Sequence, residues 1–194
     1  MNFTLFIFFL ITFLVIGSSF FLTSNNQPEI EEKLGLISPN VFDILLSDIS
    51  QDELALVARE VFGFELNSKT IEQPKYPVQG VLYGEHNRVI FPVIIQHGNR
   101  KIKTLMIYDS GCPFVFLESR ICNELGIDVI LPSSNIGVHG AKLVKTHLST
   151  NHFKEFNLMG QAFLVSEGLA VNIHGRAMKA YLVLDTLIPG NDEF

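Results

Sequence analysis

Asp109, Ser110 and Gly111 are the residues whose types and spacing are best suited to chemistry. They lie between two apolar runs, 103–108 and 114–117, which have the character of strands. Hydrogen bonds within a sheet fix the backbone on both sides of such a turn and so hold its side chains in place. The glycine permits a sharp turn and the close approach of another backbone or of a ligand. The sequence thus predicts a firmly held carboxylate and hydroxyl between two strands.

A short helix is expected over 118–125, and Gly126 is suited to end it. The order of strand, Asp-Ser-Gly, strand, helix and Leu-Gly-Ile resembles the retropepsins, the aspartic proteases of retroviruses and retrotransposons and their cellular relatives. Three positions depart from the family pattern: Tyr108, where an aliphatic residue is usual, Cys112, where alanine is usual, and Pro113, where serine, threonine or aspartate is common. The tripeptide by itself is also compatible with an ordinary solvent-facing β-turn.

The resemblance implies a mostly β fold, a closed barrel that forms one half of an acid protease, and hydrolysis of a polypeptide substrate. Catalysis in this family uses two carboxylates that share a proton, because two like charges so close cannot both ionise. The chain has a single Asp-[Ser/Thr]-Gly, so the second carboxylate must come from the Asp109 of a second copy in a twofold homodimer. Ser110 would then supply a hydroxyl that hydrogen-bonds across the dimer, and Gly111 would allow close backbone approach.

A glycine-containing hairpin is expected further on, with Gly137, Val138, His139 and Gly140 at its tip. In the retropepsins this place holds the flap, which closes over the substrate. The resemblance therefore implies that these four residues bind substrate, with 143–149 as the returning strand. The alternative is an ordinary glycine-rich surface hairpin.

Residues 169–185 repeat the plan of 93–109: a strand, a turn glycine, a basic residue, and an apolar strand that ends in aspartate. An internal pseudo-twofold is what the resemblance implies. Asp185 is not followed by Thr-Gly or Ser-Gly, and we interpret it as structural. Residues 187–190 would match the family's apolar-apolar-Gly segment, so we expect the chain to lack the helix and the terminal strand that usually follow and help to bind the partner subunit. Residues 162–165 are expected to form a strand.

The run before Asp109 belongs to a predicted hairpin, with a first strand at 89–95 and a turn at 97–100. Pro92 lacks a backbone N–H, which indicates an edge position for the first strand. The second strand becomes continuously apolar just before Asp109, which predicts that both of its faces are covered.

Residues 3–22 are almost wholly apolar and carry no charged side chain. As a helix they would be long enough to cross a bilayer core of about 30 Å. We interpret 1–23 as a transmembrane anchor, with a cleaved secretory signal as the alternative. The chain would then be a single-pass membrane protein or, after cleavage, a protein of the secretory pathway or the cell surface.

Residues 24–75 are expected to form a linker and a helical spacer. A first amphipathic helix is predicted within 38–49, and a capping-box pattern at 50–53 begins a second one. We interpret both as a spacer packed against the domain or against itself. A propeptide or a partner-binding helical hairpin is the alternative.

Composition and motifs exclude several other classes of function. A net charge of −6 without a basic cluster argues against nucleic acid as a partner. The sequence has no HExxH, CxxC, P-loop or dinucleotide fingerprint, so we expect neither a metal nor a cofactor. Cys112 and Cys122 are expected to be buried free thiols.

The sequence therefore predicts three segments: 1–23 as an anchor or signal, 24–75 as a linker and spacer, and 76–194 as a retropepsin-like domain. The expected function is that of a membrane-tethered homodimeric aspartic endopeptidase. The alternative is a catalytically inactive, membrane-anchored domain of the same fold that binds other proteins.

Overall fold

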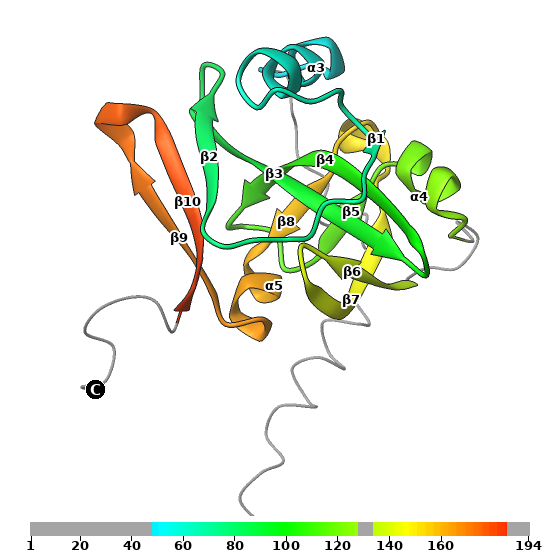
Figure 1. The fold of residues 1–194 in the computed structure, drawn as a ribbon. Coiled ribbons are helices and arrows are strands. Elements are labelled where there is room, and N and C mark those ends of the chain that lie inside the picture. The colour runs from blue at the N-terminus through cyan, green and yellow to red at the C-terminus, as the bar shows by residue number, and fades with distance from the viewer. Residues whose placement is uncertain (1–47, 128–133, 186–194) are drawn as a thin grey trace, which may run out of the picture. The chain divides into compact units, whose positions relative to one another are not determined.

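The computed structural model describes residues 48–127 and 134–185 of the chain (Figure 1). The predicted membrane segment at 3–22 lies outside these ranges, as does the segment at 187–190. No helix within the two described ranges is long and apolar enough to cross a membrane.

The described residues form three α-helices, two short 3-10 helices and ten strands. The helices are α3 (Gln51–Glu60), α4 (Ser119–Leu125), η2 (Asn151–Phe153), α5 (Gln161–Ser166) and η3 (Gly175–Ala177). The strands are β1 (Ser68–Lys69), β2 (Val78–Tyr83), β3 (Arg88–His97), β4 (Arg100–Asp109), β5 (Val115–Leu117), β6 (Ser134–Val138), β7 (Ala141–Leu148), β8 (Leu158–Gly160), β9 (Leu169–His174) and β10 (Lys179–Leu184).

Six strands close into a barrel in the order β3, β4, β8, β5, β7, β6. The ring closes at β3, which pairs with β4 along its whole length and with β6 at Ile95 and Gln96. Outside the ring, β2, β10 and β9 extend the sheet from β3, and β1 pairs with β4. The expectation of a mostly β fold with a closed barrel is therefore confirmed.

The barrel contains two copies of one motif, a hairpin followed by a short strand and a short helix. The first copy is β3–β4–β5–α4 and the second is β6–β7–β8–α5. The short strand of each copy lies parallel to the second hairpin strand of the other copy, and the two short strands pair antiparallel. This reciprocal arrangement is the internal twofold that the resemblance implied.

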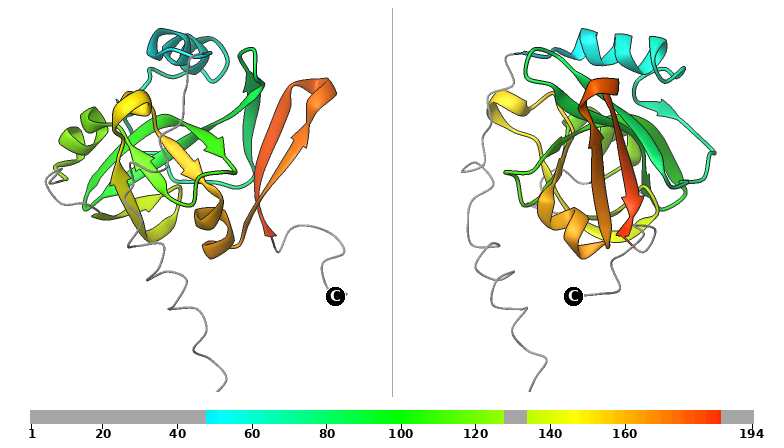
Figure 2. Two further views of the ribbon diagram at one scale, coloured as in Figure 1. Left: turned by 180° about the vertical axis from the view of Figure 1, so that it is seen from behind. Right: turned by 90° about the vertical axis from the view of Figure 1, so that its left-hand side faces the viewer.

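The partner in this repeat differs from the predicted one. Residues 169–185 do form a hairpin, β9–β10, but it lies outside the ring against β2 (Figure 2). The hairpin related to β3–β4 is β6–β7. The pattern of strand, glycine turn, basic residue and strand is common to many hairpins, so it could not tell the two apart.

Both faces of β4 are covered, as its apolar run predicted. Leu105 and Ile107 belong to a cluster that includes α3, whereas Met106 belongs to the larger cluster of the barrel. Each of the three is almost fully buried, and burial of a side chain of this size contributes about 1.5–3 kcal/mol. The strand is therefore held from two sides up to the residue before Tyr108.

The helix α3 begins at the predicted capping box. The hydroxyl of Ser50 accepts the backbone N–H of Glu53, and the carboxylate of Glu53 accepts the backbone N–H of Ser50. The buried face of the helix consists of Leu54, Val57 and Ala58. These residues pack into the same cluster as Leu105 and Ile107, so the second predicted helix of the spacer packs against the barrel. Most of the first predicted helix, at 38–49, lies outside the described residues.

Two further expectations need correction. Residues 162–165 lie in the helix α5 and not in a strand, because a short apolar run cannot be assigned by periodicity alone. The strand β3 is not at the edge of the sheet, since it has partners on both sides. Pro92 lies in the interval where the pairing with β2 ends at Ile90 and the pairing with β6 begins at Ile95. The missing N–H thus marks a local gap in the pairing.

Candidate active site

Asp109 is the last residue of β4 and lies where the two motif copies meet. The strand β8 of the second copy runs parallel beside it, with Asp109 opposite Gly160. The predicted turn thus follows β4, and β5 begins four residues beyond its glycine, at Val115. The side chain of Asp109 is partly exposed.

The backbone of the turn orients the carboxylate. The N–H of Gly111 donates to Oδ1 of Asp109 at 2.9 Å, and the N–H of Cys112 donates to the carbonyl oxygen of Asp109 at 3.2 Å. A Cβ atom at position 111 would lie 3.3 Å from that same Oδ1, so glycine leaves room for the carboxylate. Ser110 and Gly111 are exposed. The structure therefore brings the three predicted catalytic residues together on one accessible turn.

Gly160 allows β8 to approach this turn closely. A Cβ atom at this position would lie 2.3 Å from the carbonyl oxygen of Cys112 and 2.5 Å from that of Phe114. The N–H of Gln161 donates to the same Cys112 oxygen at 2.7 Å. The start of α5 thus fixes the far end of the Asp109 turn.

This apolar-apolar-Gly segment, Leu158–Gly160, was not predicted from the sequence, in which the pattern was assigned to 187–190 instead. The segment beside Asp109 is 158–160, and the described residues continue after it with α5 and then with β9 and β10. Gly190, after which no helix and no strand were expected, lies outside the described residues, so that expectation stays a prediction. The usable signal was a pair of apolar residues and a glycine directly before the Gln-Ala-Phe-Leu that begins the helix.

Tyr108 and Gln161 connect the two sides of the turn. The hydroxyl of Tyr108, directly before Asp109, donates to Oε1 of Gln161, whose backbone N–H holds Cys112. Burial, and secondarily the neighbouring Asp109 carboxylate, raises the pKa of Tyr108. The hydroxyl therefore stays protonated and remains a donor at neutral pH. This side chain departs from the aliphatic residue usual in the retropepsins, and here it serves as a hydrogen-bond donor.

The two cysteines are free and buried, as predicted. Burial raises the pKa of Cys112 to about 11 and that of Cys122 to about 11. A thiol is nucleophilic only as the thiolate, so neither side chain is activated for attack at neutral pH.

A buried polar network lies behind the site. The carboxylate of Glu118 accepts the side-chain amide of Asn67, whose oxygen accepts the hydroxyl of Thr104. Asn157 donates to that hydroxyl at 3.3 Å and accepts the backbone N–H of Glu118 at 3.0 Å. These four residues come from the segment after α3, from β4, and from the segments before α4 and β8. The network links the segments on either side of the turn, and no local sequence pattern indicated it.

The predicted flap residues form a tight turn between β6 and β7. His139 has a φ of 44° and Gly140 a φ of 96°, the positive values that a two-residue hairpin turn needs. His139 is buried, and its N–H donates to the carbonyl oxygen of Ile94 at 2.7 Å. In β3, Ile94 lies opposite Lys103, which is six residues before Asp109 in β4.

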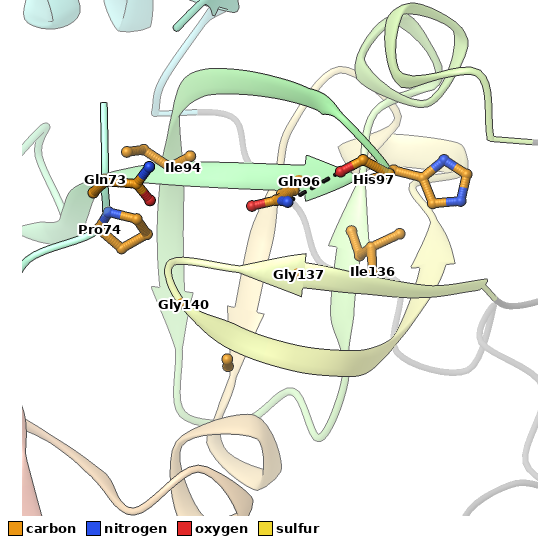
Figure 3. Close-up of a pocket in the computed structure, with 10 residues that line it drawn as sticks. Gln73, Pro74, Ile94, Gln96, His97, Ile136, Gly137 and Gly140 are labelled. Carbon is orange, nitrogen blue, oxygen red and sulfur yellow. Dashed lines mark hydrogen bonds between the residues drawn. The ribbon is translucent and has the colours of Figure 1, made fainter. Parts of the chain in front are cut away.

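Six residues of strand span roughly 20 Å. The structure therefore does not bring Gly137, Val138, His139 and Gly140 to Asp109. Gly137 and Gly140 instead line a hollow of about 640 Å³ together with Gln73 and Pro74 (Figure 3). In this structure the hairpin tip is fixed against β3, and a role in closing over substrate stays a prediction.

The chemistry available at the turn is that of a carboxylate. Asp109 is accessible, its carboxylate accepts the backbone N–H of Gly111, and it ends a strand that is buried on both faces. A carboxylate in such a position can accept or deliver a proton during catalysis. Within 48–127 and 134–185, no group of three or more His, Cys, Asp or Glu side chains is arranged to hold a metal ion.

Comparisons with known proteins identify a distant structural neighbour. No protein-family model and no curated protein matches the chain. Among solved structures, the chain is similar to the crystal structure of a retropepsin-like aspartic protease from Rickettsia conorii. The two share 15% sequence identity over 59% of this chain and 92% of the other, with a TM-score of 0.39. A similarity this distant does not establish a shared activity.

Proposed function

We propose that the chain is an aspartic endopeptidase that works as a homodimer, with Asp109 supplying one carboxylate from each subunit. The observation that carries this proposal is the Asp109 turn itself, a partly exposed carboxylate oriented by the N–H of Gly111 and braced by the close approach of Gly160. A water molecule held between two such carboxylates could be deprotonated by one while the other protonates the scissile carbonyl oxygen. Collapse of the tetrahedral intermediate then breaks the C–N bond as the amine takes up a proton.

The need for a second subunit follows from counting carboxylates. The sequence has one Asp-[Ser/Thr]-Gly, and Asp185, which ends the other predicted repeat, follows β10 outside the barrel. A twofold dimer would place two Asp109 carboxylates at one site. Because two negative charges so close repel each other, one proton would stay bound and be shared by the pair. Ser110, exposed on the same turn, is positioned to offer its hydroxyl across such an interface.

The strand β9 is a candidate for the dimer contact. It is the last strand of the sheet, and no described strand pairs with its outer edge. Its sequence, Leu-Ala-Val-Asn-Ile-His, lacks the lysine or proline that commonly protects an edge strand, and Ile173 is exposed. In the family a terminal strand helps to bind the partner subunit, and β9 together with β10 follows α5 at that place in the chain.

The proposal retains the membrane anchor at 3–22 and a polypeptide as substrate. An anchor would confine the subunits to two dimensions and raise their effective concentration for pairing. The chain would then be a single-pass membrane protein whose domain acts on peptides at the membrane surface.

The test is digestion of a peptide library by the full-length chain in detergent, from acidic to neutral pH. The decisive variant is Asp109→Asn, which is nearly isosteric but cannot share a proton. Its matched control is Asp185→Asn, at an exposed aspartate that directly follows the last residue of β10. We expect cleavage to be lost in the first variant and kept in the second. Equal cleavage by the wild type and by Asp109→Asn, or none by either at any subunit concentration, would leave a protein-binding domain as the better account.

A further inference from the structure

A hollow of about 490 Å³ lies where β1, the start of β4 and the end of α4 meet. In the pairing of β1 with β4, Lys69 lies opposite Ile102, and the N–H of Thr70 donates to the carbonyl oxygen of Lys101 at 3.1 Å. This pairing brings Lys69 beside basic residues that are distant from it in the sequence. The residues that line the hollow include Lys69, Thr70, Asn99, Arg100, Lys101 and Glu124.

The charges around this hollow are unbalanced. Lys69, Arg100 and Lys101 are cations at neutral pH, and within the described residues none of them forms an ion pair with a carboxylate. Among the described residues of the lining, Glu124 is the only acidic one, and its carboxylate is paired with Arg120 at 3.1 Å. The hollow therefore has an excess of positive charge, although the net charge of the chain is −6.

Arg100 is held so that one edge of its guanidinium group is available to a ligand. Its Nη1 donates to the carbonyl oxygen of Glu124, near the end of α4, at 3.3 Å. A Cβ atom at Gly126 would lie 2.6 Å from the same Nη1, so the lack of a side chain there lets the guanidinium lie close to the backbone. Nε and Nη2 of Arg100 have no partner in the part of the chain that the structure describes.

The free edge is the one that binds two oxygens of a single anion. Arg88 uses it in this protein, because its Nε and Nη2 donate to the carboxylate of Asp48 at 3.2 and 3.0 Å. Such parallel hydrogen bonds fix the orientation of the anion as well as attracting it. At Arg100 the described residues supply no such carboxylate, so the same donor pair is left for a ligand.

Further donors line the same hollow. Lys101 gives one of its three ammonium protons to Oε1 of Gln73 at 3.0 Å, which leaves two. The hydroxyl oxygen of Thr70 accepts the backbone N–H of Glu72 at 3.1 Å, so the hydroxyl proton can still be donated. Lys69 is exposed and adds a third positive charge.

We propose that this hollow binds a phosphate monoester group. Such a group carries about 1.5–2 negative charges at neutral pH and has three terminal oxygens. It can therefore accept the two donors of Arg100 and an ammonium group at the same time. A carboxylate has one charge and two oxygens, so it would leave part of this donor set unused.

The cluster suits one phosphate group and not a polyanion. Its three cations line a single hollow, and the next cation along β4, Lys103, is already paired with Glu72 at 2.8 Å. A nucleic acid instead requires a basic patch or stripe that follows several phosphates. A phosphate monoester can be part of a soluble molecule or of a lipid headgroup, and both present the same oxygens and charge.

The proposed phosphate site is separate from the Asp109 turn. Arg100 begins β4 and Asp109 ends it, and nine residues of strand span roughly 30 Å. Binding of phosphate at this end of the strand therefore does not depend on the proposed proteolysis, and its test needs no peptide cleavage.

The test is an NMR titration of the full-length chain in uncharged detergent micelles with glycerol 3-phosphate, a soluble phosphate monoester. We expect saturable shifts of the Arg100 Nε–H and of the backbone amides of Lys101 and Thr70, and none with glycerol. Micelles that contain phosphatidic acid present the same group on a lipid, and phosphatidylglycerol presents a phosphate diester. A response to only one of the two monoesters would assign the site to that source. No response to either monoester, or an equal response to phosphatidylglycerol, would overturn the proposal.

Variants of the lining locate the binding. Arg100→Gln should weaken the binding of glycerol 3-phosphate by about tenfold, and Lys69→Gln by about fivefold. Arg100→Lys keeps the charge but loses the paired donors, so it should also bind more weakly. The matched control is Arg176→Gln, which removes the same charge from an exposed arginine of η3 and should bind like the wild type.

Arg100 also contacts the end of α4, so its replacement could disturb folding. Lys69→Gln avoids this difficulty, because Lys69 is exposed. Wild-type affinity in Lys69→Gln, or in a folded Arg100→Lys, would overturn the proposed site.

Discussion

Gly160 stands opposite Asp109 in the parallel β4–β8 pair, at a distance from its neighbours that only glycine allows. The atoms that would meet a Cβ there are the backbone oxygens of Cys112 and Phe114, at 2.3 and 2.5 Å. Both are backbone atoms, which cannot move aside as a flexible side chain would. The backbone of Cys112 is also hydrogen-bonded to Gln161 and to Asp109. The close approach therefore couples the shape of the Asp109 turn to the position of β8.

Gly160→Ala is expected to destabilise the protein by about 3 kcal/mol, the upper range for overpacking in a well-packed core. Urea unfolding followed by circular dichroism measures this change. The control is Gly175→Ala, where no heavy atom lies within 4 Å of the added Cβ, and it should change stability by no more than about 0.5 kcal/mol. Similar stabilities for the two variants would mean that β8 does not pack against the turn as described.

Local patterns in the sequence predicted the elements whose signal is continuous along the chain. The apolar run before Asp109 indicated a strand buried on both faces, and Leu105, Met106 and Ile107 are buried in that way. The capping box at Ser50 marked the start of α3, and Gly126 ends α4 in the left-handed conformation. In each case the deciding interaction lies within a few residues of the pattern.

The misassigned features depend on contacts between distant segments. Gly160 is a special position only because the turn after Asp109 folds back onto it, some fifty residues away in the chain. His139 was predicted to bind substrate at the hairpin tip, since its sequence context could not reveal the backbone groups of Ile94 and Lys75 that contact its ring. The hairpin at 169–185 matched the repeat pattern, but its pairing with β2 excludes it from the ring.

Glu118 is expected to make stability fall as the pH rises. Burial raises its pKa, and the hydrogen bond from Asn67 offsets only part of that effect. The folded protein therefore holds this proton more tightly than the unfolded chain, and the associated stability is lost as the pH rises through the folded-state pKa. Glu118→Gln should remove this pH dependence. The free energy of unfolding of the variant, relative to that of the wild type, should therefore rise by up to about 1.5 kcal/mol between pH 4 and pH 7.

Unfolding free energies of Glu118→Gln and the wild type across this pH range provide the measurement. Glu124→Gln is the control, because Glu124 lies in α4, the helix that follows Glu118, in a surface pair with Arg120. Its pH profile should follow that of the wild type. A constant difference between Glu118→Gln and the wild type at all pH values would show that Glu118 is not titrating in a buried network.

Asp48 should have the opposite pH dependence. Its side chain is 3% exposed and accepts hydrogen bonds from Nε and Nη2 of Arg88, at 3.2 and 3.0 Å. The hydrogen bonds from Arg88 hold the pKa of Asp48 below its usual value of 3.8, so the stability they provide is present above that value and lost as the pH falls. Asp48→Asn should cost about 2 kcal/mol at pH 7, in the range for hydrogen bonds to charged groups.

The cost of Asp48→Asn should shrink as the pH falls below 3.8, because wild-type Asp48 then becomes neutral as well. Thermal unfolding at pH 7 and near pH 3 distinguishes this from a simple packing defect, which would persist at both. Glu85→Gln is the control, because it removes the same charge from an exposed residue of the neighbouring β2–β3 turn. It should leave the thermal stability unchanged.

The dimer that the proposed function requires can be tested at the edge of β9. Ile173 is 53% exposed on this strand, and its register partner Ala180 is buried in β10. A lysine on an edge strand opposes the addition of another strand, because pairing would bring its charge against the incoming chain. Ile173→Lys should therefore raise the dimer dissociation constant at least tenfold, which corresponds to about 1.4 kcal/mol.

Sedimentation of the full-length chain in detergent over a range of concentrations measures this constant. Met178→Lys is the control, since Met178 is similarly exposed at 45% but lies after η3, in the turn between β9 and β10. If both variants associate like the wild type, the subunits do not meet through β9. If Ile173→Lys is monomeric and still cleaves peptides, a single Asp109 is sufficient and the shared-carboxylate mechanism is wrong.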